Sequence, residues 1–276
     1  MPTTAANKHH WDSGYDWRQG GDEWSQPWGS VAGQWYGTIL PRINTMLPTA
    51  TVLEIACGYG RWTRYLKDSC QHLIVVDLAP KCVTACKDRF AHASNIEYHT
   101  NDGMSLAMIP DRSVDFVFSF DSLVHADHAV MSAYLGEIQR LLRDDGSAFL
   151  HHSNLGELRS AYHLLSRCRL LRRLLMRLNM LRDLRHSRDL SVSAHLVEQL
   201  AKQHGLQCVV QELVRWRDST TAIDCLSTIV KCDSPRARSN HVVRNLRFMQ
   251  EAEIARRRSE IYESSTQLGA PERVPR

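Results

Sequence analysis

Long apolar runs, paired cysteine motifs and a strong excess of one charge are all missing from this sequence. No apolar stretch approaches the roughly 20 residues that a membrane-spanning helix needs, and the first residues, MPTTAANKHHWDSG, lack the apolar centre of a secretory signal. Eight cysteines are present, but no CxxC pair suggests a zinc site. We therefore expect a cytoplasmic protein with free, mostly buried thiols.

The charge and length also restrict the function. A net charge of +4 is too mild to indicate nucleic-acid binding by itself. A chain of 276 residues with 43% hydrophobic content can bury a substantial core. We expect three parts: a tryptophan-rich segment over 1–41 that covers the site, a main domain over 42–233, and a helical tail over 234–276.

The most informative stretch is VLEIACGYGR, from Val52 to Arg61. An apolar run typical of a buried parallel strand leads into Glu54, and Gly58 and Gly60 then permit a tight turn and a close ligand approach. The following RWTRYLKD has helical spacing. Strand, glycine turn and helix form the ligand-binding unit of open α/β sheets. The dinucleotide fingerprint fails, because Thr63 stands where its third glycine should be.

Further acidic residues end the strands that follow. Asp77 closes the apolar run HLIVVD, 23 residues after Glu54, where a carboxylate can accept hydrogen bonds from a ribose diol. Asp102 ends a third strand and Asp121 a fourth, VDFVFSFDSLVH. Any one such residue also fits a helix N-cap or a turn. Four in register favour a site at the carboxyl ends of the strands.

These motifs together resemble the class I S-adenosylmethionine-dependent methyltransferases. The resemblance implies an α/β, Rossmann-like fold with a seven-stranded, mostly parallel sheet, one antiparallel strand, helices on both faces and a helical insertion after the fifth strand. S-adenosyl-L-methionine is the implied cofactor. The implied cofactor-binding residues follow the strand ends: Glu54, Ala56, Cys57, Gly58, Gly60, Arg61, Asp77, Leu78, Asn101, Asp102, Gly103 and Phe120.

A narrower likeness concerns the acceptor. The stretches WGSVAGQWYGTILPRI, FDSLVHAD and HHSN resemble bacterial sugar and polysaccharide O-methyltransferases, the group of the methylmannose polysaccharide 1-O-methyltransferases. That likeness implies a hydroxyl acceptor on a glycan or related small molecule, with magnesium as a plausible helper. It also places the acceptor against aromatic side chains, for which the candidates are Trp28, Trp35 and Tyr36.

Transfer to a hydroxyl requires removal of a proton, and histidine suits that role near neutral pH. His125 follows Asp121 by one helical turn, and His151 and His152 end the fifth strand. Because adjacent strand residues point to opposite sides, only one of His151 and His152 is expected to face the site. Asp121 completes the candidate catalytic group, and with a histidine it could hold a divalent metal.

Other acceptors and roles stay open. The Asn-Pro-Pro-Tyr-like run of base amino-methyltransferases is absent after the fourth strand, and no Pro-Cys pair offers a cytosine-attacking thiolate. A natural product, a lipid or a nucleic acid remains an alternative acceptor, and a noncatalytic cofactor-binding scaffold is a further alternative. The sequence leaves a homodimer open.

Two segments have unusual composition. Five of the seven tryptophans lie between Trp11 and Trp35, which indicates either anchoring rings or a cover over the site. The insertion over 155–190 alternates leucines with arginines, so it is either a core-facing leucine stripe with a solvated basic back, a lid that meets an anionic or polyhydroxylated acceptor, or a membrane-surface contact. Its arginines are Arg159, Arg167, Arg169, Arg172, Arg173, Arg177, Arg182, Arg185 and Arg188. A charged helix is expected from about Val242 to Tyr262.

Overall fold

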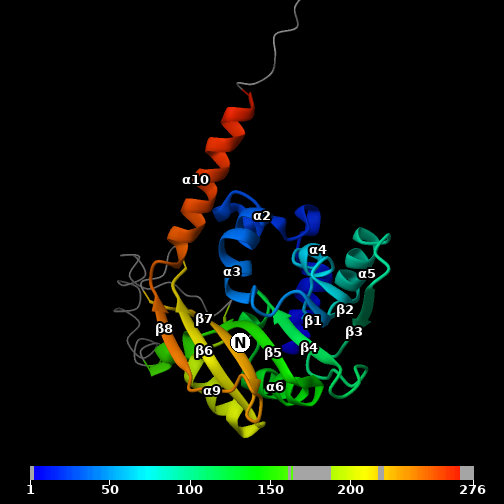
Figure 1. The fold of residues 1–276 in the computed structure, drawn as a ribbon, viewed down its shortest axis with the longest axis vertical. Coiled ribbons are helices and arrows are strands. Elements are labelled where there is room, and N and C mark those ends of the chain that lie inside the picture. Colours follow the sequence, from blue (N-terminus) through cyan, green and yellow to red (C-terminus); the bar gives the residue numbers. More distant parts are fainter. Residues whose placement is uncertain (1–2, 161–162, 164–187, 217–220, 268–276) are drawn as a thin grey trace, which may run out of the picture.

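A single sheet with helices on both sides forms the centre of the computed structural model, which describes residues 3–160, 163, 188–216 and 221–267 (Figure 1). The strand order is β3-β2-β1-β4-β5-β7-β6-β8. The strands are β1 (Thr49–Ile55), β2 (Cys70–Asp77), β3 (Ile96–Thr100), β4 (Val114–Ser119), β5 (Leu142–Ser153), β6 (Leu206–Val214), β7 (Asp224–Lys231) and β8 (His241–Asn245).

The first four helices are shorter than those that follow them. Short ones come first: α1 (Thr4–His9), α2 (Val31–Gln34), α3 (Leu40–Ile43) and α4 (Thr63–Leu66). The longer ones are α5 (Pro80–Arg89), α6 (His128–Leu141), α9 (Ala194–Gln203) and α10 (Phe248–Gln267). Short turns of 3₁₀ or π helix occupy His10–Gly14, Trp17–Gln19, Asp22–Trp28, Trp35–Ile39, Leu123–His125 and Leu155–Leu158.

The strand directions follow the expected pattern. Neighbours from β3 through β5 run parallel, and β7 is antiparallel to both β5 and β6. The predicted single antiparallel strand is therefore confirmed. The number of strands was wrong, because the described residues form eight strands and not seven.

The extra strand, β8, lies where the sequence predicted the start of the C-terminal helix. His241 to Asn245 pair in parallel with Val210 to Val214 of β6, and the helix α10 begins only at Phe248. The β-branched pair Val242 and Val243 suits an extended strand. The neighbouring edge of β6 supplies the backbone partners, and a helical pattern in the sequence could not reveal that edge.

Each face of the sheet packs against its own helices. On one face, Leu53, Val117 and Leu150 meet apolar side chains of α6 and α9. On the other face, Val52 and Phe118 meet the N-terminal helices and α10. Because strand side chains alternate between the faces, a continuous apolar strand builds both cores at once.

α10 extends beyond the sheet (Figure 1). Its first turns pack through Phe248 and Ala252 against the segment around Trp28 and Trp35. Within the described residues, no helix is long and apolar enough to cross a membrane. Most of the predicted Arg- and Leu-rich insertion lies outside the described residues.

Candidate active site

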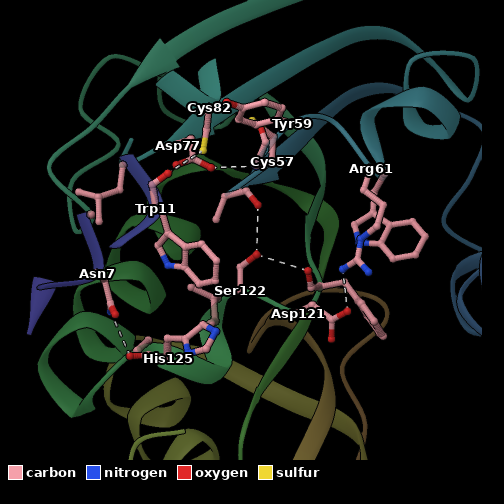
Figure 2. A pocket seen from close by; sticks show the side chains of 18 of the residues that line it. Asn7, Trp11, Cys57, Tyr59, Arg61, Asp77, Cys82, Asp121, Ser122 and His125 are labelled. Carbon is pink, nitrogen blue, oxygen red and sulfur yellow. Dashed lines mark hydrogen bonds and ion pairs between the residues drawn. The ribbon is translucent and has the colours of Figure 1, made fainter. Parts of the chain in front are cut away.

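A pocket opens at the carboxyl ends of β1, β2 and β4, beneath the N-terminal segment (Figure 2). Open α/β sheets place their ligands at this end. Of the predicted site residues, the pocket wall contains Ala56, Cys57, Gly58, Arg61, Asp77, Leu78, Gly103, Phe120, Asp121 and His125.

The glycine turn after β1 forms one wall of this pocket. Gly58 and Gly60 have φ of +55° and +83°, a left-handed conformation that favours glycine. A Cβ on Gly60 would lie 2.5 Å from Phe90 Cε2, and one on Gly58 would lie 3.1 Å from the ring of Trp17. A side chain at position 60 would therefore clash with Phe90, and one at position 58 would fit only tightly against Trp17.

Asp77 joins the end of β2 to this turn. Its carboxylate accepts hydrogen bonds from the backbone N–H groups of Gly58 at 2.9 Å and Ala79 at 2.8 Å. Burial raises the pKa of Asp77 to about 6, although these N–H donors oppose the rise. The side chain thus holds the turn and also lines the pocket.

The turn after β3 is held by its own side chains. Asn101 accepts from the Gly103 N–H and donates to the hydroxyl of Tyr134, while Asp102 accepts from the N–H groups of Met104 and Ser105. Gly103 reaches the pocket wall, whereas Asn101 and Asp102 are not part of it. The two polar residues therefore shape this wall from behind.

Glu54 lies beneath the glycine turn and not in the pocket wall. Thr63 Oγ1 donates to its carboxyl at 2.5 Å, and its other oxygen, Oε1, is buried without a hydrogen bond within the described structure. Burial raises the pKa of Glu54 to about 8. The side chain is consequently protonated at neutral pH.

A buried ion pair stands at the end of β4. Arg61 Nη2 lies 2.6 Å from Asp121 Oδ2, and the guanidinium also lies over the rings of Trp62 at 4.4 Å and Trp24 at 5.1 Å. Asp121 has φ of +63°, which is unusual for a residue other than glycine. Arg61, with His151 also in contact, holds the pKa of Asp121 well below its usual range against the effect of burial.

His151 lies behind the pocket and contacts Asp121, the acid of this ion pair. Its Nδ1 lies 3.1 Å from Asp121 Oδ1, and its Nε2 lies 3.3 Å from Asp224 Oδ2. Asp224 in turn receives two 2.7 Å hydrogen bonds from Arg188. Burial opposes protonation, but the two aspartates outweigh it and raise the pKa of His151.

The adjacent His152 points to the opposite face of the sheet, as the alternation of strand side chains predicts. It is fully buried, and its Nε2 lies 2.8 Å from the hydroxyl of Ser227. Burial lowers its pKa to about 4. Neither His151 nor His152 lines the pocket.

His125 is the histidine in the pocket wall. Its ring lies 5.4 Å from that of Trp11, and Asn7 donates to its backbone carbonyl (Figure 2). Burial, together with the charge of Arg188, lowers the pKa of His125 to about 4. Its imidazole is therefore neutral at physiological pH.

The tryptophan-rich segment divides into two groups. Trp11, Trp17 and Trp24 line the pocket, and Trp17 stacks on Tyr59 with ring centres 4.5 Å apart. The three predicted acceptor contacts lie elsewhere: Trp28 and Trp35 are buried in the core, and Tyr36 is 62% exposed on the surface. Composition indicated a cover over the site, but it could not show which indoles form it.

The predicted metal site can be checked only within the described residues. Among the described residues, no group of three or more His, Cys, Asp or Glu side chains is arranged to hold a metal ion. Both carboxylate oxygens of Asp121 already face Arg61 and His151. The predicted magnesium role therefore has no support.

Comparison with known proteins agrees with this arrangement. Residues 52–146, about a third of the chain, match a family described as a methyltransferase domain. Phosphoethanolamine N-methyltransferase 1 of Caenorhabditis elegans is 27% identical over 108 residues, which are 39% of this chain and 22% of that protein. The chain thus matches about a fifth of the length of this relative.

Two solved structures share the fold. The PH0226 protein of Pyrococcus horikoshii OT3 gives a TM-score of 0.50 at 20% identity, covering 73% of this chain and 93% of that one. The N-methyltransferase NodS of Bradyrhizobium japonicum WM9 gives 0.50 at 15% identity, covering 71% and 94%. At such identities the likeness concerns the fold alone.

Proposed function

We propose that this chain is a class I S-adenosylmethionine-dependent methyltransferase that transfers the cofactor's methyl group to a hydroxyl of a sugar, glycan or related small molecule. The match of residues 52–146 to a methyltransferase domain supports the methyl-transfer part of this proposal. The observation that carries the proposal is His125, a neutral imidazole in the pocket wall beside the end of β4. The place of this ring in the pocket wall and its neutral state allow it to accept a proton, although a pKa of about 4 makes it a weak base.

The pocket suits the cofactor by its chemistry. Asp77 offers a carboxylate to the ribose hydroxyls, and Leu78 and Gly103 form the adjoining wall. A Cβ on Gly103 would lie 2.9 Å from Thr4 Cγ2, so this wall has no space for a larger residue. Trp11, Trp17 and Trp24 would cover the bound molecule and exclude water.

The methyl group arrives already activated on the sulfonium of S-adenosylmethionine. The protein's own task is then to orient the acceptor for in-line attack and to remove its proton. The unprotonated nitrogen of His125 would accept that proton as the acceptor oxygen bonds to the methyl carbon, while the carbon–sulfur bond breaks and S-adenosylhomocysteine leaves. Arg61 and Asp121 fix the polar side of the pocket, where the acceptor is expected to lie.

A methyl-transfer assay with a His125→Ala variant tests this role. We expect turnover to fall by about 10²- to 10⁴-fold, the usual contribution of a positioned general base. The affinity for S-adenosylhomocysteine, measured by calorimetry, should change less than about threefold. His128→Ala is the matched control, because His128 is exposed close by and does not line the pocket.

Two results would contradict the proposal in different ways. Undiminished turnover in His125→Ala would exclude this histidine as the base. A wild-type protein that releases no heat with S-adenosylhomocysteine would favour the noncatalytic scaffold instead.

An amine is the second candidate acceptor, favoured by the match to a phosphoethanolamine N-methyltransferase. An ammonium group must also lose a proton before attack, so His125 would serve the same role. A radiolabelled-methyl screen of glucose, mannose, ethanolamine and phosphoethanolamine distinguishes the two. Label in the amines alone would replace the hydroxyl proposal.

A further inference from the structure

The side chain of Arg61 has one hydrogen-bonding group that the fold leaves unused. Arg61 is 4% exposed and lines the pocket. Its Nη2 is held by Asp121, but its Nη1 is buried and makes no hydrogen bond within the described structure. A buried donor of a charged group without a partner is costly in free energy.

The surroundings hold this guanidinium rigidly in place. The indoles of Trp24 and Trp62 lie over it, and the ion pair with Asp121 fixes its remaining edge. Planar stacking and a forked donor geometry distinguish arginine from lysine at such a position. The free nitrogen is therefore oriented before any ligand arrives.

Nearby carboxylates do not complete its hydrogen bonding. The second oxygen of Asp121 faces His151. In the N-terminal segment, Glu23 is the acid nearest to Arg61 in the sequence. It accepts a hydrogen bond from Tyr15, and among the described residues no ion pair joins it to Arg61. The buried line of Arg61, Asp121, His151, Asp224 and Arg188 has two arginines for two aspartates, and the histidine adds positive charge whenever it is protonated.

We propose that Arg61 Nη1 binds an anionic group, a carboxylate or phosphate, of the methyl acceptor. The assignment rests on the proposed methyltransferase function. Figure 2 shows Arg61 and Asp121 on one side of the pocket and Asp77 on the other. The carboxylate proposed to bind the ribose and the proposed anion position are therefore separate. An anion at Nη1 would supply the missing hydrogen bond and balance the charge of the guanidinium.

The test uses the whole protein and inorganic phosphate as the probe. The protein is first saturated with S-adenosylhomocysteine, and phosphate is then titrated by calorimetry, with acetate as the smaller carboxylate. We expect Arg61→Lys to weaken phosphate binding by at least tenfold, because lysine keeps the charge but loses the second nitrogen. Arg64→Lys is the matched control: Arg64 lies in α4, three residues after Arg61, pairs with Asp22 at 2.5 Å, and does not line the pocket.

The cofactor's own carboxylate is the other source of an anion. Affinities for S-adenosylhomocysteine and for 5′-methylthioadenosine, which lacks the amino-acid portion, separate the two sources. Under the proposal, Arg61→Lys changes neither affinity by more than about threefold. Selective weakening of S-adenosylhomocysteine would show that the cofactor occupies this nitrogen, and would overturn the proposal.

The remaining outcomes are equally decisive. Absence of phosphate and acetate binding to the wild-type complex, or equal binding to Arg61→Lys, would refute the anion site. Thermal unfolding of each variant confirms that the fold is retained, and Arg61→Gln provides a second variant if the lysine is not tolerated. Failure of the wild type to bind S-adenosylhomocysteine would instead refute the methyltransferase function on which the proposal rests.

Discussion

Burial decides the role of single residues in this site more than their position in a motif does. Glu54 and Asp77 both end strands that lead to the pocket, yet only Asp77 reaches its wall. Glu54 is enclosed under the glycine turn, where desolvation is the largest influence on its carboxyl group. Its role is therefore structural: as a neutral acid it accepts the hydrogen bond of the Thr63 hydroxyl.

This burial makes stability depend on pH. The pKa of Glu54 is raised from 4.5 to about 8, so the folded state retains a proton that the unfolded state releases. Unfolding free energy should fall as pH rises from about 4.5 to about 8. The non-ionising variant Glu54→Gln removes this loss, and its stability relative to the wild type should increase by about 2–4 kcal/mol between pH 5 and pH 9.

Urea unfolding of both proteins at pH 5 and pH 9 measures the effect. Asp77 titrates in both proteins, so its contribution largely cancels in the difference. A stability difference that is independent of pH would show that Glu54 ionises normally in the folded protein.

At the scale of elements, the glycine turn fits between a strand and a helix on one side and an aromatic cover on the other. Phe90, which follows α5, and Trp17 of the N-terminal segment approach the turn from different parts of the chain. The turn is therefore a packing junction as well as a ligand wall.

Gly60→Ala tests this junction. The added methyl group would meet Phe90 at 2.5 Å and Cys86 Sγ at 3.0 Å, in a backbone conformation with φ of +83°. We expect a loss of about 2–4 kcal/mol in unfolding free energy from strain and overpacking, together with weaker S-adenosylhomocysteine binding. Chemical denaturation and calorimetry measure the two effects.

Gly14→Ala is the control for this substitution, because the nearest atom to its Cβ is His10 Nδ1 at an ordinary 3.5 Å. Its stability should stay within about 1 kcal/mol of the wild type. Equal losses in the two variants would mean that the turn does not require glycine.

At the scale of the whole molecule, one arginine connects three distant parts of the chain. Arg42 of α3 donates to Glu212 of β6 at 2.7 Å and to Glu251 of α10 at 2.8 Å. Asn245 of β8 donates to both glutamates. The N-terminal segment, the far edge of the sheet and the last helix are thus held by one mostly buried network.

Removing this arginine should destabilise the molecule substantially. In Arg42→Leu two carboxylates lose their shared partner, and we expect a loss of about 2–4 kcal/mol. Arg257→Leu, on the exposed side of α10 where Arg257 pairs with Glu253, should cost less than about 1 kcal/mol. Thermal and urea unfolding compare the variants, and similar small losses in both would show that the network contributes little.

The sequence determined the fold class and the glycine-turn wall of the pocket. The apolar strands, the Gly58 and Gly60 turn and the acid at Asp77 are local signals, because backbone torsions and strand-end positions depend on neighbouring residues. The antiparallel strand, which the structure shows as β7, was implied by the resemblance that these motifs carry. The match of residues 52–146 to a methyltransferase domain agrees with this interpretation.

Only the tertiary structure decided which distant residues close the pocket. It selected Trp11, Trp17 and Trp24 as the cover, placed His151 behind the wall, and left His125 facing the pocket. It also paired β8 with an edge that lies about 30 residues away in sequence. These outcomes depend on which distant parts of the chain pack together. That packing decides which side chains line the pocket, and their burial shifts their pKa.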